Sequence, residues 1–174
     1  MNRDGADIMA IATDLRIEEV KPIIVRKHIL ILILGAVLMA CNNDYQYSHY
    51  ESVPEEGWDK DSALIFSFSV DDTTHNYSIE MNIRHNQQYL YQNIWLFTEL
   101  YADSVLLGRD TLEYYLANQR GEWLGNGSGR LRDMPALWLN EMQFNAESRY
   151  VMKIYQGMRE EELKGVEAIG VIVR

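Results

Sequence analysis

The chain has 174 residues, 47% of them hydrophobic, with 26 acidic against 16 basic residues and a single cysteine. This length is enough for one domain with a sizeable core. The net charge of −10 argues against nucleic acid and against anionic lipid headgroups as ligands, because both would be repelled, and one cysteine excludes an intramolecular disulfide.

Residues 1–24 are not expected to be part of a folded domain. It carries five acidic residues where the start of a secretion signal is normally basic. Val25 comes directly before the basic cluster at 26–28, and a GUG start codon would be translated as Val inside an extended reading frame. We therefore expect translation to begin at Val25 and residues 1–24 to be a misannotated N-terminal extension.

An apolar run over 29–40 follows the basic cluster and ends at Cys41. A helix needs about 20 apolar residues to cross a bilayer, so this run is too short to span one and instead matches the hydrophobic region of a signal peptide. The end of the run, LMAC, resembles a bacterial lipobox, although Met39 is bulky for its position. We predict a lipoprotein signal peptide over 25–40 and lipidation of Cys41. A secretory signal followed by a free cysteine, or an uncleaved hydrophobic core helix, is the alternative.

Lipidation would anchor the protein without a membrane-spanning segment. A thiol can accept a diacylglyceryl group as a thioether, and each buried methylene contributes about 0.8 kcal/mol to membrane binding. Asn42 is not the Asp that retains lipoproteins at the inner membrane in some bacteria, so attachment to the outer membrane is favoured, on either face. Residues 41–57 are polar and contain proline, which predicts a lipidated tether before the folded domain at 58–174.

Alternation of apolar and polar residues predicts strands through most of this domain. Segments 63–70 and 77–84 are expected to form a hairpin, because turn-forming residues join them. Segment 93–102 has apolar residues in both phases, which predicts a central strand covered on both sides, with Trp95 and Phe97 in the core. Further strands are expected at 110–116, 137–144, 149–156 and 166–174.

Two other segments do not show this alternation. Segment 158–165 predicts one short helix that ends at Gly165, and 121–130 is a Gly-rich turn region. About seven to nine short strands, with turns every 8 to 12 residues and almost no amphipathic helix, predict an all-β fold. The expected architecture is an antiparallel β-sandwich of the jelly-roll or Ig-like kind.

Five motifs in a fixed order resemble the GldH family of gliding-motility lipoproteins of the Bacteroidetes. They are Trp58 ahead of the first alternating strand, Arg84 with YLYQNIWLF (89–97), RDTLEYYL (109–116), GEWLGNG (121–127), and YQGMREEELKGVEAIGV (155–171). The likeness covers nearly all of the mature chain and includes the lipobox, but Leu90 stands where Pro is expected in many relatives.

This resemblance implies a membrane-anchored lipoprotein of the cell envelope that acts with other envelope lipoproteins of the gliding machinery. It implies no enzyme activity, no cofactor and no small-molecule substrate. Relatives also occur in bacteria of this phylum that do not glide, so the resemblance does not prove motility. The candidate interaction residues are Trp58, Arg84, Tyr91, Trp95, Asp110, Trp123, Gly125, Met158 and Arg159.

Two of these motifs allow a physical interpretation. Arg84 could stack on Tyr89 or Tyr91, or it could pair with Asp110; the alternative is an arginine at the rim of a solvated sheet face. In the glycine-rich loop, Gly125 permits positive φ and the neighbouring tryptophan is expected to close one end of the sandwich. Such a loop is more often structural than ligand-binding.

The sequence offers no catalytic or metal-binding motif. Its four histidines lack HExxH spacing, and no GxSxG motif occurs, so we expect no catalytic residue and no metal. The acidic stretches 59–61 and 71–72 could share a calcium ion, although such loops are usually just solvated. The main alternative function is a surface or periplasmic carbohydrate-binding lipoprotein. Exposed rings in a row on one concave face would favour a sugar, whereas scattered rings would favour a protein partner.

Overall fold

The computed structural model describes residues 45–145 and 148–174, and the part of the chain that it describes contains strands and no helix. The predicted N-terminal extension, the signal peptide and Cys41 lie outside the described residues. The strands are β1 (Tyr47–Ser52), β2 (Trp58–Asp59), β3 (Leu64–Ser69), β4 (Tyr77–His85), β5 (Asn93–Ala102), β6 (Val105–Tyr115), β7 (Arg132–Met142), β8 (Arg149–Gln156), β9 (Glu162–Leu163) and β10 (Val166–Val173).

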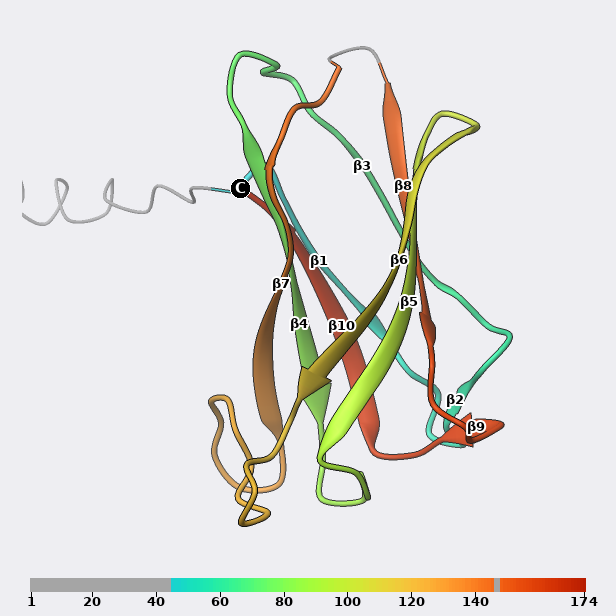
Figure 1. The fold of residues 1–174 in the computed structure, drawn as a ribbon, viewed down its shortest axis with the longest axis vertical. Coiled ribbons are helices and arrows are strands. Elements are labelled where there is room, and N and C mark those ends of the chain that lie inside the picture. Colours follow the sequence, from blue (N-terminus) through green and yellow to red (C-terminus); the bar gives the residue numbers. More distant parts are fainter. Residues whose placement is uncertain (1–44, 146–147) are drawn as a thin grey trace, which may run out of the picture. The chain divides into compact units, whose positions relative to one another are not determined.

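The strands form two four-stranded antiparallel sheets, β1-β10-β4-β7 and β3-β8-β5-β6, and a two-stranded ribbon, β2-β9 (Figure 1). Five pairs are nested about the β5–β6 turn: β5 with β6, β4 with β7, β3 with β8, β2 with β9, and β1 with β10. The chain is thus one long hairpin that is folded over on itself. This folding adds two further pairs, β10 with β4 and β8 with β5. This order of strands in two sheets is that of a jelly roll.

Both sheets contribute to one hydrophobic core. Buried and half-buried residues alternate strictly along β4, where Ile79, Met81 and Ile83 are fully buried. In the other sheet, Ile94 and Leu96 of β5 are buried in the same cluster. Because side chains of a strand point alternately to opposite faces, each sheet has one inner and one outer face, as in a sandwich. The prediction of an all-β chain with antiparallel sheets is confirmed.

The predicted helix at 158–165 is wrong. Glu162 and Leu163 form β9 and pair with β2, and the Leu163 side chain is buried. Gly165 has a φ of +86°, and a Cβ there would lie 2.2 Å from the backbone nitrogen of Tyr89. Burial of Leu163 and strand pairing therefore outweigh the local helix propensity of this acidic segment. With the two-residue strands β2 and β9 included, the strands outnumber the predicted seven to nine.

The predicted hairpin of segments 63–70 and 77–84 is also wrong. β3 pairs with β8 and β4 pairs with β10 and β7, so residues 70–76 cross from one sheet to the other. Turn-forming residues permit a crossing as readily as a hairpin, and the choice is made by strands distant in sequence. The segment predicted as a tether is partly folded as well, because β1 lies within it and pairs with β10.

Candidate functional site

Strand β5 carries the aromatic side chains that open the site. It lies between β8 and β6, so its backbone is central in the sheet. Its inner face holds Ile94 and Leu96, both fully buried, but Trp95 and Phe97 point to the outer face and are 37% and 47% exposed. The prediction that this strand is covered on both sides, with Trp95 and Phe97 in the core, is therefore wrong.

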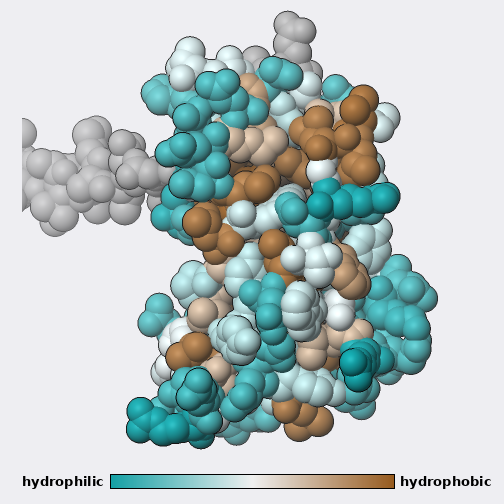
Figure 2. All heavy atoms as spheres, viewed as in Figure 1, coloured by the Kyte–Doolittle hydropathy of each residue, from teal (hydrophilic) through white to brown (hydrophobic). Residues whose placement is uncertain are grey.

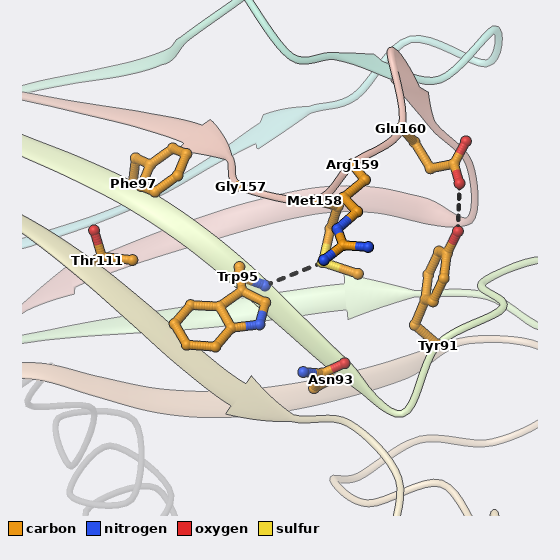
Figure 3. A pocket seen from close by; sticks show the side chains of 9 residues that line it. All are labelled: Tyr91, Asn93, Trp95, Phe97, Thr111, Gly157, Met158, Arg159 and Glu160. Atoms are coloured by element: carbon orange, nitrogen blue, oxygen red, sulfur yellow. Dashed lines mark hydrogen bonds between the residues drawn. The ribbon is translucent and has the colours of Figure 1, made fainter.

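These two rings line a groove of about 450 Å³ on the outer face of the sheet β3-β8-β5-β6 (Figure 3). The segment after β8 forms its second side, and the segment before β5 closes one end. The lining residues are Tyr91, Asn93, Trp95, Phe97, Thr111, Gly157, Met158, Arg159 and Glu160.

A buried glutamine holds the segment after β8 in place. The Gln156 side chain is 2% exposed; its Nε2 donates to the carbonyl of Glu160 over 2.7 Å, and its Oε1 accepts from the Met158 nitrogen over 2.8 Å. The backbone nitrogen of Trp95 donates to the Met158 sulfur over 3.3 Å. The groove wall is thus fixed to β5 and β8 before any ligand arrives.

The rim of the groove is polar. The Tyr91 hydroxyl donates to Oε1 of Glu160, and this hydrogen bond, with partial burial, raises the pKa of Tyr91. Asn93 donates to Glu113 of the neighbouring strand. Arg159 lines the groove without an ion pair to any residue in the described part of the chain. Its guanidinium therefore keeps its five donors available.

A second hollow of about 380 Å³ continues from the groove along β5 and shares Phe97 and Thr111 with it. Here the outer face becomes charged: Arg109 Nε lies 2.8 Å from Oε1 of Glu99, and Oε2 of the same carboxylate accepts a 2.7 Å hydrogen bond from Tyr101. The bond from Tyr101 and the nearby Arg109 lower the pKa of Glu99. The charged groups at this end of the face therefore already have hydrogen-bond and ion-pair partners.

Exposed apolar residues also gather at the β5–β6 turn, where Figure 2 shows hydrophobic surface at one end of the molecule. Val105, Leu106 and Leu107 are 65%, 39% and 48% exposed. These residues line neither the groove nor the hollow that continues from it, so the patch is not part of this candidate site.

Arg84 lies on the outer face of the opposite sheet, and its contacts differ from the predicted ones. Its Nε lies 2.8 Å from Oδ1 of Asp133 on β7, and its guanidinium lies 5.2 Å from the centre of the Tyr50 ring. The Asp133 carboxylate raises the pKa of Arg84. The contact types were foreseen, but the partners are Tyr50 and Asp133 and not Tyr89, Tyr91 or Asp110.

Asp110 and Trp58 have structural contacts. Asp110 on β6 accepts a 2.8 Å hydrogen bond from the indole nitrogen of Trp138 on β7, so it joins the two sheets at one edge. Trp58 is 1% exposed, and its indole nitrogen donates to the carbonyl of Ser62 over 2.9 Å. Neither side chain faces the groove.

The glycine-rich loop is likewise structural. Trp123 packs on the buried His85 ring at 4.7 Å between ring centres, so it covers the core at one end of β4. Gly125 has a φ of +80°, and a Cβ there would lie 2.4 Å from the carbonyl oxygen of Asp133. Only glycine fits this position.

The groove therefore gathers four of the nine candidate residues, namely Tyr91, Trp95, Met158 and Arg159. Sequence reasoning missed Phe97, Gly157 and Glu160, among others. A signal for Phe97 was present, since Glu99 lies in the same phase of the strand and a charged residue marks the solvent side. Nothing in the sequence marks Gly157 as a residue that lines a groove.

The described ranges contain no cluster of three or more His, Cys, Asp and Glu side chains arranged to hold a metal ion. Within 45–145 and 148–174, no helix has the length and apolar character needed to span a bilayer.

Fold and site together define an all-β protein of two antiparallel sheets with an aromatic groove on one outer face. The family model described as GldH lipoprotein matches residues 45–173. The chain belongs to the GldH lipoprotein family.

Two relatives with known names support this assignment. The chain is 33% identical over 150 residues to a protein of Christiangramia forsetii named gliding motility lipoprotein GldH homolog, covering 82% of this chain and 91% of that protein. It is 33% identical over 141 residues to gliding motility lipoprotein GldH of Flavobacterium johnsoniae, covering 80% and 87%.

Similarity to solved structures is weak. A subviral particle of the infectious bursal disease virus protein VP2 matches 74% of this chain and 30% of that chain, with 11% identity and a TM-score of 0.28. Dimeric latent PorU of Porphyromonas gingivalis matches 77% of this chain and 13% of that chain, with 10% identity and the same TM-score. Scores this low carry no argument about fold or function.

Proposed function

We propose that this protein is a lipid-anchored lipoprotein of the cell envelope and a non-catalytic component of the gliding-motility assembly or of a related envelope assembly. The observation that carries the proposal is the family match over 45–173, which begins four residues after Cys41. The relatives named above are called gliding motility lipoproteins. The expected partners are other envelope lipoproteins of the same machinery.

The anchor would hold the domain close to the membrane. The backbone nitrogen of Gln46 already donates to the carbonyl of Val173 over 2.9 Å, so the chain joins the sheet five residues after Cys41. Five residues span at most about 17 Å when fully extended. This link is much shorter than a tether reaching to residue 57. Outer-membrane attachment, on either face, fits the absence of Asp after Cys41.

A binding role without catalysis fits the groove. No histidine, cysteine or serine is among its lining residues in the described chain. Its one lining carboxylate, Glu160, accepts the hydrogen bond of Tyr91. The preformed wall, the exposed rings and the available guanidinium are features of recognition.

The first test measures lipidation of Cys41. Cells that express the full-length protein are fed an alkyne fatty acid, and the purified product is coupled to a fluorophore. We expect label on the wild type and on an Asn43→Ala control, and none on Cys41→Ala. The Cys41→Ala protein should remain folded and leave the membrane fraction. An unlabelled wild-type product contradicts the anchor.

The second test concerns the assembly. The tagged lipoprotein is purified from its native host after mild crosslinking, beside the Cys41→Ala variant. Other envelope lipoproteins should co-purify with the wild type and be depleted with the variant, because anchoring brings the partners to one surface. Recovery of no envelope protein with the wild type contradicts the assembly role.

A further inference from the structure

We propose that the groove on the outer face of the sheet β3-β8-β5-β6 binds a neutral glycan chain, with Trp95 and Phe97 as its stacking platform. This inference deepens the proposed function, and rests on it, by naming what the anchored domain would hold in the envelope. The family resemblance named four residues of this groove, but the sequence did not show that they form one surface, because both rings appeared to belong to the core.

The platform consists of two rings in a row. Trp95 and Phe97 lie two residues apart on β5, so their side chains leave the same face about 7 Å apart along the strand. They are 37% and 47% exposed, although β5 is central in its sheet and its inner face is fully buried. A sugar ring presents a flat face of C–H groups, and such a face packs on an exposed aromatic ring.

Hydrogen-bonding groups surround these rings, as a sugar requires. Asn93 lies beside Trp95 in the groove, and Thr111 is the cross-strand partner of Phe97. Arg159 lies across from Trp95 without an ion pair in the described chain (Figure 3). A hydroxyl-rich ligand can exchange its water for these donors and acceptors while its apolar face covers the rings. A purely apolar protein segment would leave the same polar groups without partners, which is costly.

A glycine lets the two rings of the platform pack closely against the segment after β8. Gly157 is not among the glycines with positive φ, so its backbone does not require glycine. A Cβ at this position would lie 3.1 Å from the Trp95 Cβ and 3.2 Å from ring atoms of Phe97. A side chain here would press on both residues and shift the Phe97 ring, so the glycine keeps the two rings in their places, as glycine does where other groups approach the backbone closely.

The groove continues beyond the platform at both ends. Towards β6 it shares Phe97 and Thr111 with the hollow of about 380 Å³, and towards the segment before β5 it shares Tyr91 and Glu160 with one of about 200 Å³. A row of hollows suits a chain of sugars better than a single one. The net charge of −10 disfavours polyanionic glycans, so the chain is expected to be neutral.

The test uses the full-length lipidated protein in detergent micelles and affinity gel electrophoresis through a panel of neutral and acidic polysaccharides. We expect at least one neutral polysaccharide to retard the wild type. Trp95→Ala and Phe97→Ala should each weaken binding at least tenfold, and Gly157→Val should weaken it similarly although both rings remain. Leu137→Ala, which removes a 55% exposed side chain from β7 in the other sheet, is the matched control and should bind like the wild type. Circular dichroism checks that each variant is folded.

Three results would overturn the proposal. They are binding to no polysaccharide of the panel, binding that the three groove variants leave unchanged, and binding confined to acidic polysaccharides. If the groove variants instead lose the co-purifying envelope lipoproteins while no glycan binds, the groove is a protein interface. Lipidation of Cys41 and co-purification are read out separately, so failure of glycan binding leaves the proposed function standing.

Discussion

The outer faces of the two sheets carry similar residues that have different roles. Each face carries an aromatic ring, an arginine and a glycine outside the positive-φ region. On the sheet β1-β10-β4-β7 these are Tyr50, Arg84 and Gly170, and on the sheet β3-β8-β5-β6 they are Trp95, Arg159 and Gly157.

On the first face each of these three residues has a contact partner within the chain. The Tyr50 ring covers Gly170, where a Cβ would lie 2.6 Å from ring atoms, and its hydroxyl accepts a 2.9 Å hydrogen bond from Asn82. Arg84 stacks on the same ring and pairs with Asp133. A belt of contacts thus crosses all four strands of this sheet, and the face is closed.

On the second face the same residue types leave space and donors unused. Gly157 adjoins an open groove, and Arg159 has no ion pair among the described residues. Native proteins satisfy their polar groups where stability is the only requirement. A face that keeps rings exposed and a guanidinium available is therefore the better candidate for recognition, whereas the closed face serves stability.

The largest expected effect distinguishes the two glycines. Gly170→Val should lower the free energy of unfolding by about 2–3 kcal/mol, because the new side chain displaces the Tyr50 ring and its contacts. Gly157→Val should cost about 1 kcal/mol or less, because the half-exposed Phe97 ring can turn towards solvent and the contact with the Trp95 Cβ requires only a small shift. Urea denaturation of both variants measures the difference. Equal losses would show that the two faces are packed alike.

The two arginines provide a smaller contrast. Arg84→Ala should cost about 1–2 kcal/mol, because it leaves a half-buried Asp133 carboxylate without its bidentate partner; partial exposure limits the loss. Arg159→Ala should change stability by less than about 0.5 kcal/mol. In a double-mutant cycle, Asp133→Ala should cost less in the Arg84→Ala background than in the wild type. Additive losses would mean that the pair contributes nothing.

Much of the fold could be predicted from local pattern. Strict alternation located β4, because this strand buries one face against the core and the period of two is then enforced at every position. The crossing between β3 and β4 could not be predicted. Its cause is pairing with β8 and β10, which lie more than 70 residues further along the chain.

The site was predictable only in part. The family resemblance pointed to Tyr91, Trp95, Met158 and Arg159, but it could not say that they meet, because the segments around 91–97 and 157–160 adjoin only through the pairing of β5 with β8. Trp95 and Phe97 appeared to be core residues since large aromatic side chains usually are buried. Exposed rings on a central strand break that rule, and such exceptions are expected at functional sites.

The smallest expected effect is a pH dependence of stability that is absent at neutral pH. It arises from a histidine buried between the two sheets. The His85 ring is fully buried beside Trp123, and burial lowers its pKa, with a further lowering from the nearby Arg132 and opposing contributions from the Asn86 carbonyl and Asp133. The unfolded chain binds a proton near pH 6.5, while the folded chain binds it only at lower pH. The free energy of unfolding should therefore be unaffected above about pH 7.5, fall as the pH drops through 6.5, and level off below the folded pKa.

His85→Phe should reduce this slope between pH 7 and pH 5, because the variant has no group there to protonate on unfolding. Urea denaturation of the wild type and the variant at matched pH values gives the two slopes, and each unit by which burial lowers the pKa corresponds to about 1.4 kcal/mol. The carboxylates with lowered pKa, Asp72 and Glu99, titrate below this range and leave the comparison undisturbed. An unchanged slope in the variant would show that His85 is not the group responsible.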